Sequence, residues 1–106
     1  MSTVKDFEKN IKDTEGKPRW NLINLKGIEG IVKVREFGDI KYTNSKGWRK
    51  VDPIDWVNAI KRHLTEMDEK GIFSCDDESG LPHIWHIGCN FFFLSMKYYW
   101  RDNESS

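Results

Sequence analysis

The stretch DPIDWVNAIKRHLTEMDEKG, residues 52–71, decides the fold of this chain. Asp52 suits a helix N-cap, and Pro53 follows at the first helical position, where its missing N–H costs nothing. Apolar residues then recur at intervals of three and four, and Gly71 provides a stop. The members of this stripe are Val57, Ile60, Leu64 and Met67. The pattern predicts an amphipathic helix that begins at Pro53 and ends before Gly71.

Two further helices are predicted on either side of this one. From Ile28 to Lys41 apolar residues recur mostly every three positions, which favours an amphipathic helix. From Pro82 to Tyr99 the chain is apolar on nearly all sides, so we expect a helix that is central to the core or shared with another subunit. Residues 43–47 and 72–80 have the composition of loops.

The 106 residues have the length of a single small domain. We expect a helical domain over residues 17–101. Residues 1–16 are predicted to form a flexible N-terminal arm or a short helix, and residues 102–106 a polar tail. The fold class is therefore all-α, a small bundle of three to five helices that oligomerisation would complete.

Charge and apolar patterning exclude several classes of protein. Lys+Arg and Asp+Glu both total 17, and a general nucleic-acid binder needs a basic surplus, so no nucleic-acid polymer is expected as partner. The longest apolar run, residues 91–94, is too short to span a bilayer, and the N-terminus lacks a secretory pattern. We therefore expect a cytoplasmic protein in which Cys75 and Cys89 are free thiols, although their spacing alone leaves a disulfide open.

A cluster of histidines and acids is the strongest chemical signal. Three polar residues share one face of the last helix: His83, His86 and Asn90. Residues 76–78 (DDE) stand just before that helix, and His63 lies on the preceding one. If the two helices pack antiparallel, all three histidines converge with carboxylates, a mixed nitrogen and oxygen set that suits a divalent metal.

Each of these features also has a plain structural interpretation. A histidine on an apolar face is more often a hydrogen-bonded core residue, and acids before a helix are usually capping groups. Glu36 and Asp39 have the spacing of a cation-binding pair but fit a solvated helix face better. No Walker A loop, GxGxxG or GxSxG occurs, which disfavours P-loop, dinucleotide-binding and acyl-transfer enzymes.

Basic residues interleaved with aromatic ones could bind phosphates and stack a base, or simply form an ordinary surface. The basic members are Lys17, Arg19, Lys41, Lys46, Arg49 and Lys50, and the aromatic ones are Trp20, Tyr42 and Trp48.

Five sequence blocks, taken together, resemble a phage and prophage family known as the dATP/dGTP diphosphohydrolase N-terminal domain, which is related in fold to the MazG-like all-α nucleotide pyrophosphohydrolases. The blocks are KPRW (17–20), EFGDIKY (36–42), GWRK (47–50), RHL (62–64) and DDESGLPHIWHIGCNFFFL (76–94). Their order and rough spacing match the family over about residues 17–94. The segment ESGLPH followed by H-x-x-x-N is the most specific part.

The resemblance implies a MazG-like helical fold and a metal-dependent reaction, in which water attacks between the α- and β-phosphates of a purine dNTP and releases dNMP and pyrophosphate. The cofactor would be Mg²⁺ or Mn²⁺, with Zn²⁺ as a further candidate. By matching position, the metal ligands would be His63, Asp76, Glu78, His83 and His86, of which Glu78, His83 and His86 would be catalytic. The substrate-binding residues would be Lys17, Arg19, Lys41, Tyr42, Trp48, Arg49, Arg62 and Asn90.

The resemblance also implies assembly into a dimer or tetramer, and host cytoplasm as the location if a phage encodes the chain. Two alternatives stay open at this point. The chain could be a non-catalytic phage accessory or assembly module that keeps the helical fold. A metal could instead be purely structural and hold the last two helices together.

Overall fold

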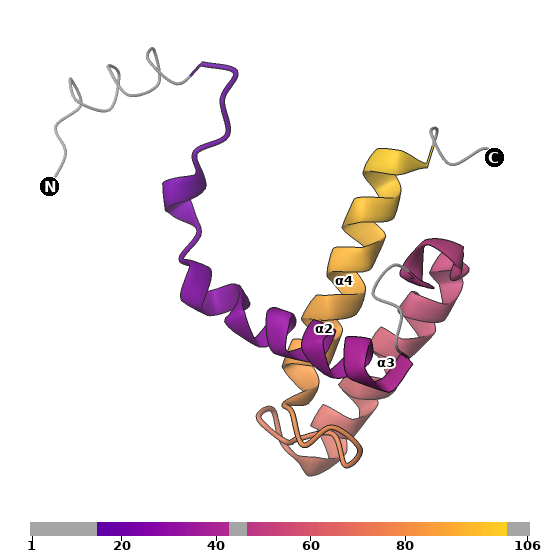
Figure 1. Ribbon diagram of the computed structural model, residues 1–106. Coiled ribbons are helices and arrows are strands. Elements are labelled where there is room, and N and C mark those ends of the chain that lie inside the picture. Colours follow the sequence, from indigo (N-terminus) through magenta and orange to yellow (C-terminus); the bar gives the residue numbers. More distant parts are fainter. Residues whose placement is uncertain (1–14, 43–46, 102–106) are drawn as a thin grey trace, which may run out of the picture.

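The computed structural model describes residues 15–42 and 47–101, and all regular structure in these ranges is helical (Figure 1). The described ranges contain three α-helices: α2 (Glu29–Tyr42), α3 (Pro53–Lys70) and α4 (His83–Trp100). Three short 3₁₀ turns accompany them: η1 (Trp20–Leu22), η2 (Leu25–Ile28) and η3 (Gly47–Lys50). The predicted all-α fold is confirmed, and the expected arm and tail lie almost entirely outside the described residues.

Helix α3 begins and ends as its sequence predicts. The Oδ1 atom of Asp52 accepts a hydrogen bond from the backbone N–H of Ile54 at 3.1 Å, and Pro53 occupies the first turn. At the other end Gly71 adopts a φ of +114°, which only glycine reaches without strain, and its N–H donates to the carbonyl of Met67 at 2.9 Å. The sequence therefore fixes both ends of α3, and the end at Gly71 fixes where the following loop starts.

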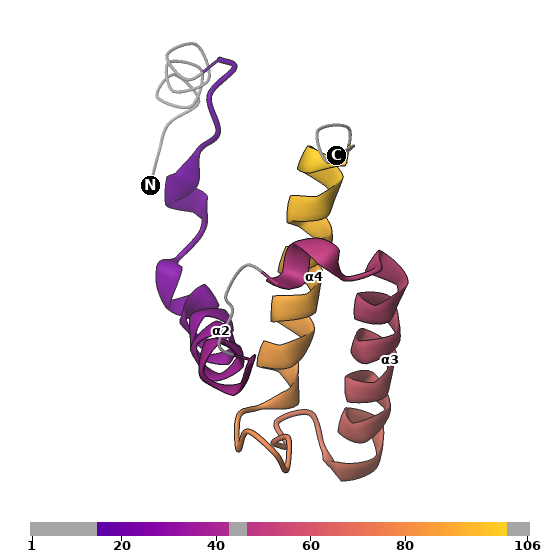
Figure 2. The same cartoon turned by 45° about the vertical axis from the view of Figure 1, so that its right-hand side comes forward.

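Helix α4 is the central element of the bundle. It packs against α3 on one side and α2 on the other, and Figure 2 shows it between them. The loop that follows Gly71 turns the chain back, so α3 and α4 run antiparallel side by side. Residues 15–28 lead away from the bundle (Figures 1 and 2). None of the helices in the described part of the chain combines the length and apolarity that a membrane-spanning segment needs.

Aromatic side chains form much of the α3–α4 interior. Trp56 of α3 is buried and stacks on Phe93 of α4, with ring centroids 5.3 Å apart. Trp48 from η3 stacks on the same phenyl ring at 5.7 Å and approaches Trp100 at 6.1 Å. Such pairs contribute about 0.5–1.5 kcal/mol each beyond their buried area, so η3 is attached to the bundle by its tryptophan. Gly47, expected in a loop, is therefore the first residue of a short 3₁₀ turn.

Helices α2 and α4 approach closely because a glycine stands at the crossing on each helix. A Cβ atom on Gly30 of α2 would lie 2.2 Å from the indole of Trp85. A Cβ atom on Gly88 of α4 would lie 3.0 Å from the side chain of Ile31. The two contacts are reciprocal, since each glycine receives a large side chain of the other helix.

The two cysteines are free thiols in contrasting surroundings. Cys75 lies exposed in the loop before α4, whereas Cys89 is buried within that helix. Burial raises the pKa of the Cys89 thiol to about 11, although the nearby Arg35 guanidinium acts in the opposite direction. The Cys89 thiol is therefore protonated at neutral pH, and only the thiolate is a strong nucleophile.

We expect a thiol reagent at pH 8 to modify Cys75 readily and Cys89 at least about tenfold more slowly, because Cys89 is both protonated and covered. Counting released chromophore in native and in denatured protein measures this. One fast thiol in native protein and two after denaturation is the expected result. A Cys75→Ser variant serves as the control, and it should show no fast phase.

Candidate functional site

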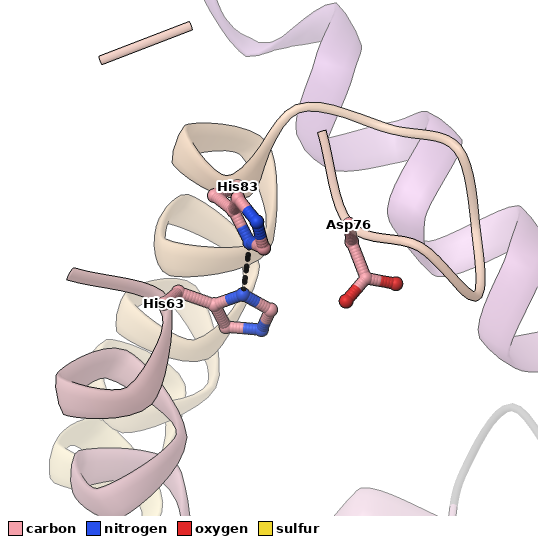
Figure 3. A group of neighbouring side chains, drawn as sticks. All are labelled: His63, Asp76 and His83. Carbon is pink, nitrogen blue, oxygen red and sulfur yellow. Dashed lines mark hydrogen bonds between the residues drawn. The ribbon is translucent and has the colours of Figure 1, made fainter. Parts of the chain in front are cut away.

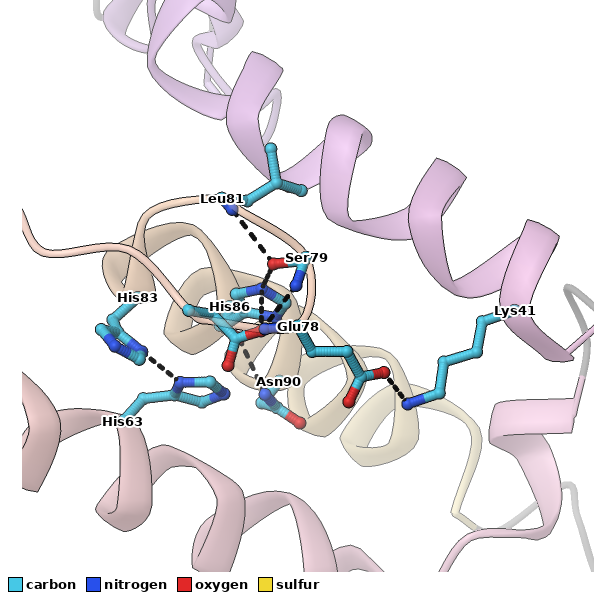
Figure 4. Close-up of polar contacts among 9 residues, drawn as sticks. Lys41, His63, Glu78, Ser79, Leu81, His83, His86 and Asn90 are labelled. Atoms are coloured by element: carbon cyan, nitrogen blue, oxygen red, sulfur yellow. Dashed lines mark hydrogen bonds and ion pairs between the residues drawn. The ribbon is translucent and has the colours of Figure 1, made fainter.

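The three histidines and Asp76 lie together at the end of the bundle where the loop from α3 enters α4 (Figures 3 and 4). His63 comes from α3, Asp76 from the loop, and His83 and His86 from the first turn of α4. The structure thus brings the histidines together with a carboxylate, as antiparallel packing of the two helices predicts.

The loop holds its own shape through backbone hydrogen bonds. The N–H of Asp76 donates to the carbonyl of Leu81 at 2.8 Å, and the N–H of Gly80 donates back to the Asp76 carbonyl at 2.8 Å. Gly80 has a φ of +73°, a conformation that glycine adopts without cost. The N–H of His83 donates to the carbonyl of Ser74 at 2.9 Å, so the loop is fastened to the start of α4. Asp76 therefore has a fixed position relative to the histidines.

Two of the histidines share a hydrogen bond. The Nδ1 atoms of His63 and His83 are 2.8 Å apart, so one ring donates and the other accepts (Figure 3). His83 is only 3% exposed, and its Nε2 has no hydrogen-bond partner among the described residues. Buried polar atoms are almost always partnered, so an unpartnered imidazole nitrogen at this position fits a side chain that binds a ligand.

The electrostatics of the cluster favour neutral imidazoles at His63 and His86 beside an ionised Asp76 carboxylate. Burial lowers the pKa of His63, and the adjacent His86 and His83 lower it further. Burial also lowers the pKa of His86, against the opposing charge of Asp76. For Asp76 burial acts to raise the pKa, but hydrogen bonds from Ser79 and the charge of His86 outweigh it, and the pKa is lowered. These are the protonation states that metal ligands require.

The residues present fit a divalent metal ion. His63, Asp76 and His83 each offer one donor atom, and these atoms all lie within 4.8 Å of one another. Metal–ligand bonds of about 2.0–2.2 Å keep ligand atoms within about 4 Å of each other, so this group is close to the size of a metal site. An open cavity of about 210 Å³ adjoins the cluster. Its lining consists of Arg62, His63, Glu66, Lys70, Asp76, Asp77 and His83.

His86 stands beside this triad and is held by Ser79 (Figure 4). The Oγ atom of Ser79 is 2.7 Å from Nε2 of His86, and it also accepts a hydrogen bond from the N–H of Leu81 at 3.1 Å. The His86 ring stacks on His63 with centroids 4.8 Å apart and planes 12° from parallel. Sequence reasoning missed Ser79, although its place between Glu78 and Gly80 in the ESGLPH segment was a signal.

Glu78 pairs with Lys41 of α2, and its carboxylate lies toward that helix (Figure 4). The backbone of Glu78 meets the cluster, since its N–H donates to Oδ2 of Asp76 at 3.1 Å, and the charge of its carboxylate acts to raise the pKa of His86. Lys41, expected to bind phosphate, joins α2 to the site loop through this pair. Asn90 donates from Nδ2 to the carbonyl of His86 at 2.7 Å, one turn back along its own helix.

The other residues expected to bind substrate are distributed around the molecule. Arg62 lines the cavity beside His63. Trp48 belongs to the aromatic interior, and the guanidinium of Arg49 lies 5.8 Å from its ring centre. Lys17 and Arg19 belong to the segment that leads away from the bundle, and the side chain of Tyr42 lies outside what the structure describes. Of this group, the structure brings Arg62 to the cavity.

Comparison with known families decides the relationship. The sequence profile described as "dATP/dGTP diphosphohydrolase, N-terminal" matches residues 8–105. The chain belongs to this family. No curated protein sequence and no solved structure matches the chain. The match to the dATP/dGTP diphosphohydrolase N-terminal family includes every residue of the histidine cluster and its loop, and the family name points to nucleotide hydrolysis.

Proposed function

We propose that this chain is a metal-dependent nucleoside triphosphate pyrophosphohydrolase that converts purine dNTPs to dNMP and pyrophosphate in the cytoplasm. The observation that carries the proposal is the grouping of His63, Asp76 and His83 beside an open cavity. Membership of a family named for dATP/dGTP diphosphohydrolases supports the choice of reaction and of purine substrates.

The metal would be held by His63, Asp76 and His83. Two imidazoles and one carboxylate suit Mn²⁺ or Zn²⁺ as well as Mg²⁺. When bound, such an ion supplies positive charge against the phosphates and activates water for attack. The chain supplies a neutral His63 ring and an ionised Asp76 carboxylate at neutral pH, so these two ligands need not lose protons first.

Two residues would act around this centre. Arg62 lies at the cavity, where its planar guanidinium can bind two oxygens of one phosphate. His86 is oriented by Ser79 and supports the His63 ring from one face, so we propose it as a positioning residue.

The catalytic and metal-binding roles of Glu78, and the roles of the base-binding residues, stay predictions. The Glu78 carboxylate would have to leave Lys41 before it could accept a proton or bind a metal. The indole of Trp48 would have to leave Trp56 and Phe93 before it could stack on a base.

Pyrophosphate release from each of the four dNTPs tests the proposal. We expect purified protein with Mn²⁺ or Mg²⁺ to release pyrophosphate from dATP, dGTP or both at least about tenfold faster than from dCTP and dTTP, as a purine site requires. Addition of EDTA should stop the reaction. Folded protein that releases no pyrophosphate from any dNTP would instead support the non-catalytic module. A melting temperature that collapses with EDTA, in protein with no activity, would indicate a structural metal.

A further inference from the structure

A tight turn over residues 71–74, at the start of the site loop, presents two large apolar side chains to solvent. Ser74 closes the turn, since its N–H donates to the Gly71 carbonyl at 3.1 Å and its hydroxyl donates to the same oxygen at 2.7 Å. The central positions of turns usually carry Gly, Pro, Asn, Asp or Ser. Here they carry Ile72, which is 66% exposed, and Phe73, which is 84% exposed, more than any other large apolar side chain in the described ranges. Local rules of this kind are broken mostly at functional sites.

The 71–74 turn lies between two residues of the candidate site. Lys70, which lines the cavity, ends α3 just before the turn, and the proposed metal ligand Asp76 follows the turn closely. Each of them is three residues from Phe73. Because consecutive Cα atoms are 3.8 Å apart, the Cα atom of Phe73 lies at most about 11 Å from theirs. The hydrogen bonds of Ser74 give the turn a fixed shape, so the phenyl ring projects from a held backbone close to the metal site.

The cavity beside the metal site is too small to enclose a whole nucleotide. Its volume is about 210 Å³, whereas pockets that enclose drug-sized ligands have about 300–1,000 Å³. Toward the bundle interior the space is filled, because Trp56 lies two turns before His63 on the same face of α3 and stacks on Phe93. The cavity opens at Asp77, a site-loop residue that is 95% exposed, and this loop lies at the outer end of the bundle (Figures 1 and 2). A nucleotide with its phosphates in the cavity would therefore leave its base outside, beside the site loop.

We propose that the Phe73 ring stacks on the purine base of the bound nucleotide, an assignment that rests on the proposed pyrophosphohydrolase function. The expected base-binding residue Trp48 would first have to leave its aromatic partners, whereas the Phe73 ring is already accessible. Stacking on an aromatic ring needs only a π-face on the base, and Ile72 adds apolar surface next to the ring. A purine has two fused rings and covers more of a phenyl group than a pyrimidine does, so this contact also favours purines.

Binding of the two reaction products tests the proposal without catalysis, because dAMP and dGMP carry the base and pyrophosphate does not. Calorimetric titrations with Mn²⁺ present should use the purine monophosphate that the wild-type protein binds more tightly. Phe73→Ala should bind it about 5- to 150-fold more weakly, the loss expected for one base–aromatic stack, and should bind pyrophosphate as the wild type does. Phe73→Trp should retain binding of the monophosphate. Phe73→Leu should lose it, because leucine keeps the apolar surface but has no ring.

Tyr99→Ala is the matched control, since it removes an aromatic side chain that is 76% exposed near the opposite end of α4. It should bind both products as the wild type does. An unchanged affinity of Phe73→Ala for the monophosphate, or an equal loss of its affinity for pyrophosphate, overturns the role of Phe73. Wild-type protein that binds pyrophosphate but neither monophosphate overturns it as well. The proposed function fails on a different measurement, the absence of pyrophosphate release from dNTPs by the wild type, so the two failures are distinguishable.

Discussion

Replacing Asp76 with asparagine is expected to lower kcat/KM for pyrophosphate release by about 100- to 1,000-fold. Loss of a group that merely orients a metal ligand costs about 10- to 100-fold, and Asp76 is proposed as a ligand itself. The amide keeps an oxygen that can accept from the N–H groups of Glu78 and Ser79, so the loop should retain its shape. What the variant loses is the negative charge beside His63 and His83.

The neighbouring Asp77→Asn variant is the matched control. The Asp77 carboxylate is 95% exposed and lies 4.0 Å from Lys70, at the rim of the cavity. We expect its removal to change kcat/KM less than about threefold, as for an exposed ion pair. Calorimetric titration with Mn²⁺ gives a readout without substrate, and Asp76→Asn alone should lose affinity. Equal losses in the two variants would contradict the assignment of Asp76.

Helices α2, α3 and α4 were predictable because their signals are local. Asp52, Pro53 and Gly71 mark both ends of α3 in the sequence, and the structure uses all three as predicted. Helices α2 and α4 also begin and end within about a residue of the predicted positions, since periodicity and flanking turn residues define them. The α2–α4 crossing was not predictable, because a glycine within a helix does not reveal which side chain it will meet.

The candidate site was predictable in its ligand types and less so in its contacts. Helical spacing and a short loop suffice to bring His63 near His83, so these side chains could be paired from the sequence. The pairing of Glu78 with Lys41 spans 37 residues and depends on how α2 crosses the bundle, which no local pattern encodes. Ser79 lies within the ESGLPH segment, but the sequence does not indicate that it contacts His86, because this contact depends on how the loop folds back on α4.

The almost uniform apolarity of α4 follows from the number of surfaces that this helix serves. One face packs against α3 and carries His83 and His86, and a second receives Ile31 of α2 at Gly88. A helix that packs against two neighbours has little room for charge, whereas α3 has a single apolar face and therefore a recognisable apolar stripe in its sequence.

Gly30→Ala is expected to lower the free energy of unfolding by about 2 kcal/mol, because the added methyl group would overlap the Trp85 indole and force the two helices apart. For a domain of this size the melting temperature should fall by roughly 8–16 °C. Gly38→Ala is the matched control, since it lies in the same helix and its Cβ would meet nothing within 4 Å. There alanine should raise stability by about 0.5–1 kcal/mol through its helix propensity.

The two substitutions are expected to change the free energy of unfolding in opposite directions, so comparing them separates the effect of packing from that of helix propensity. A double-mutant cycle with Trp85→Ala then tests whether Trp85 is the side chain that Gly30 accommodates. If the clash with Trp85 is the cause, Gly30→Ala should become neutral or stabilising once the indole is removed, because only the propensity gain then remains. Thermal unfolding followed by circular dichroism measures all four proteins of the cycle. A Gly30→Ala penalty of the same size in the Trp85→Ala background would mean that the indole is not what Gly30 accommodates, and that the close approach of α2 and α4 does not depend on this contact.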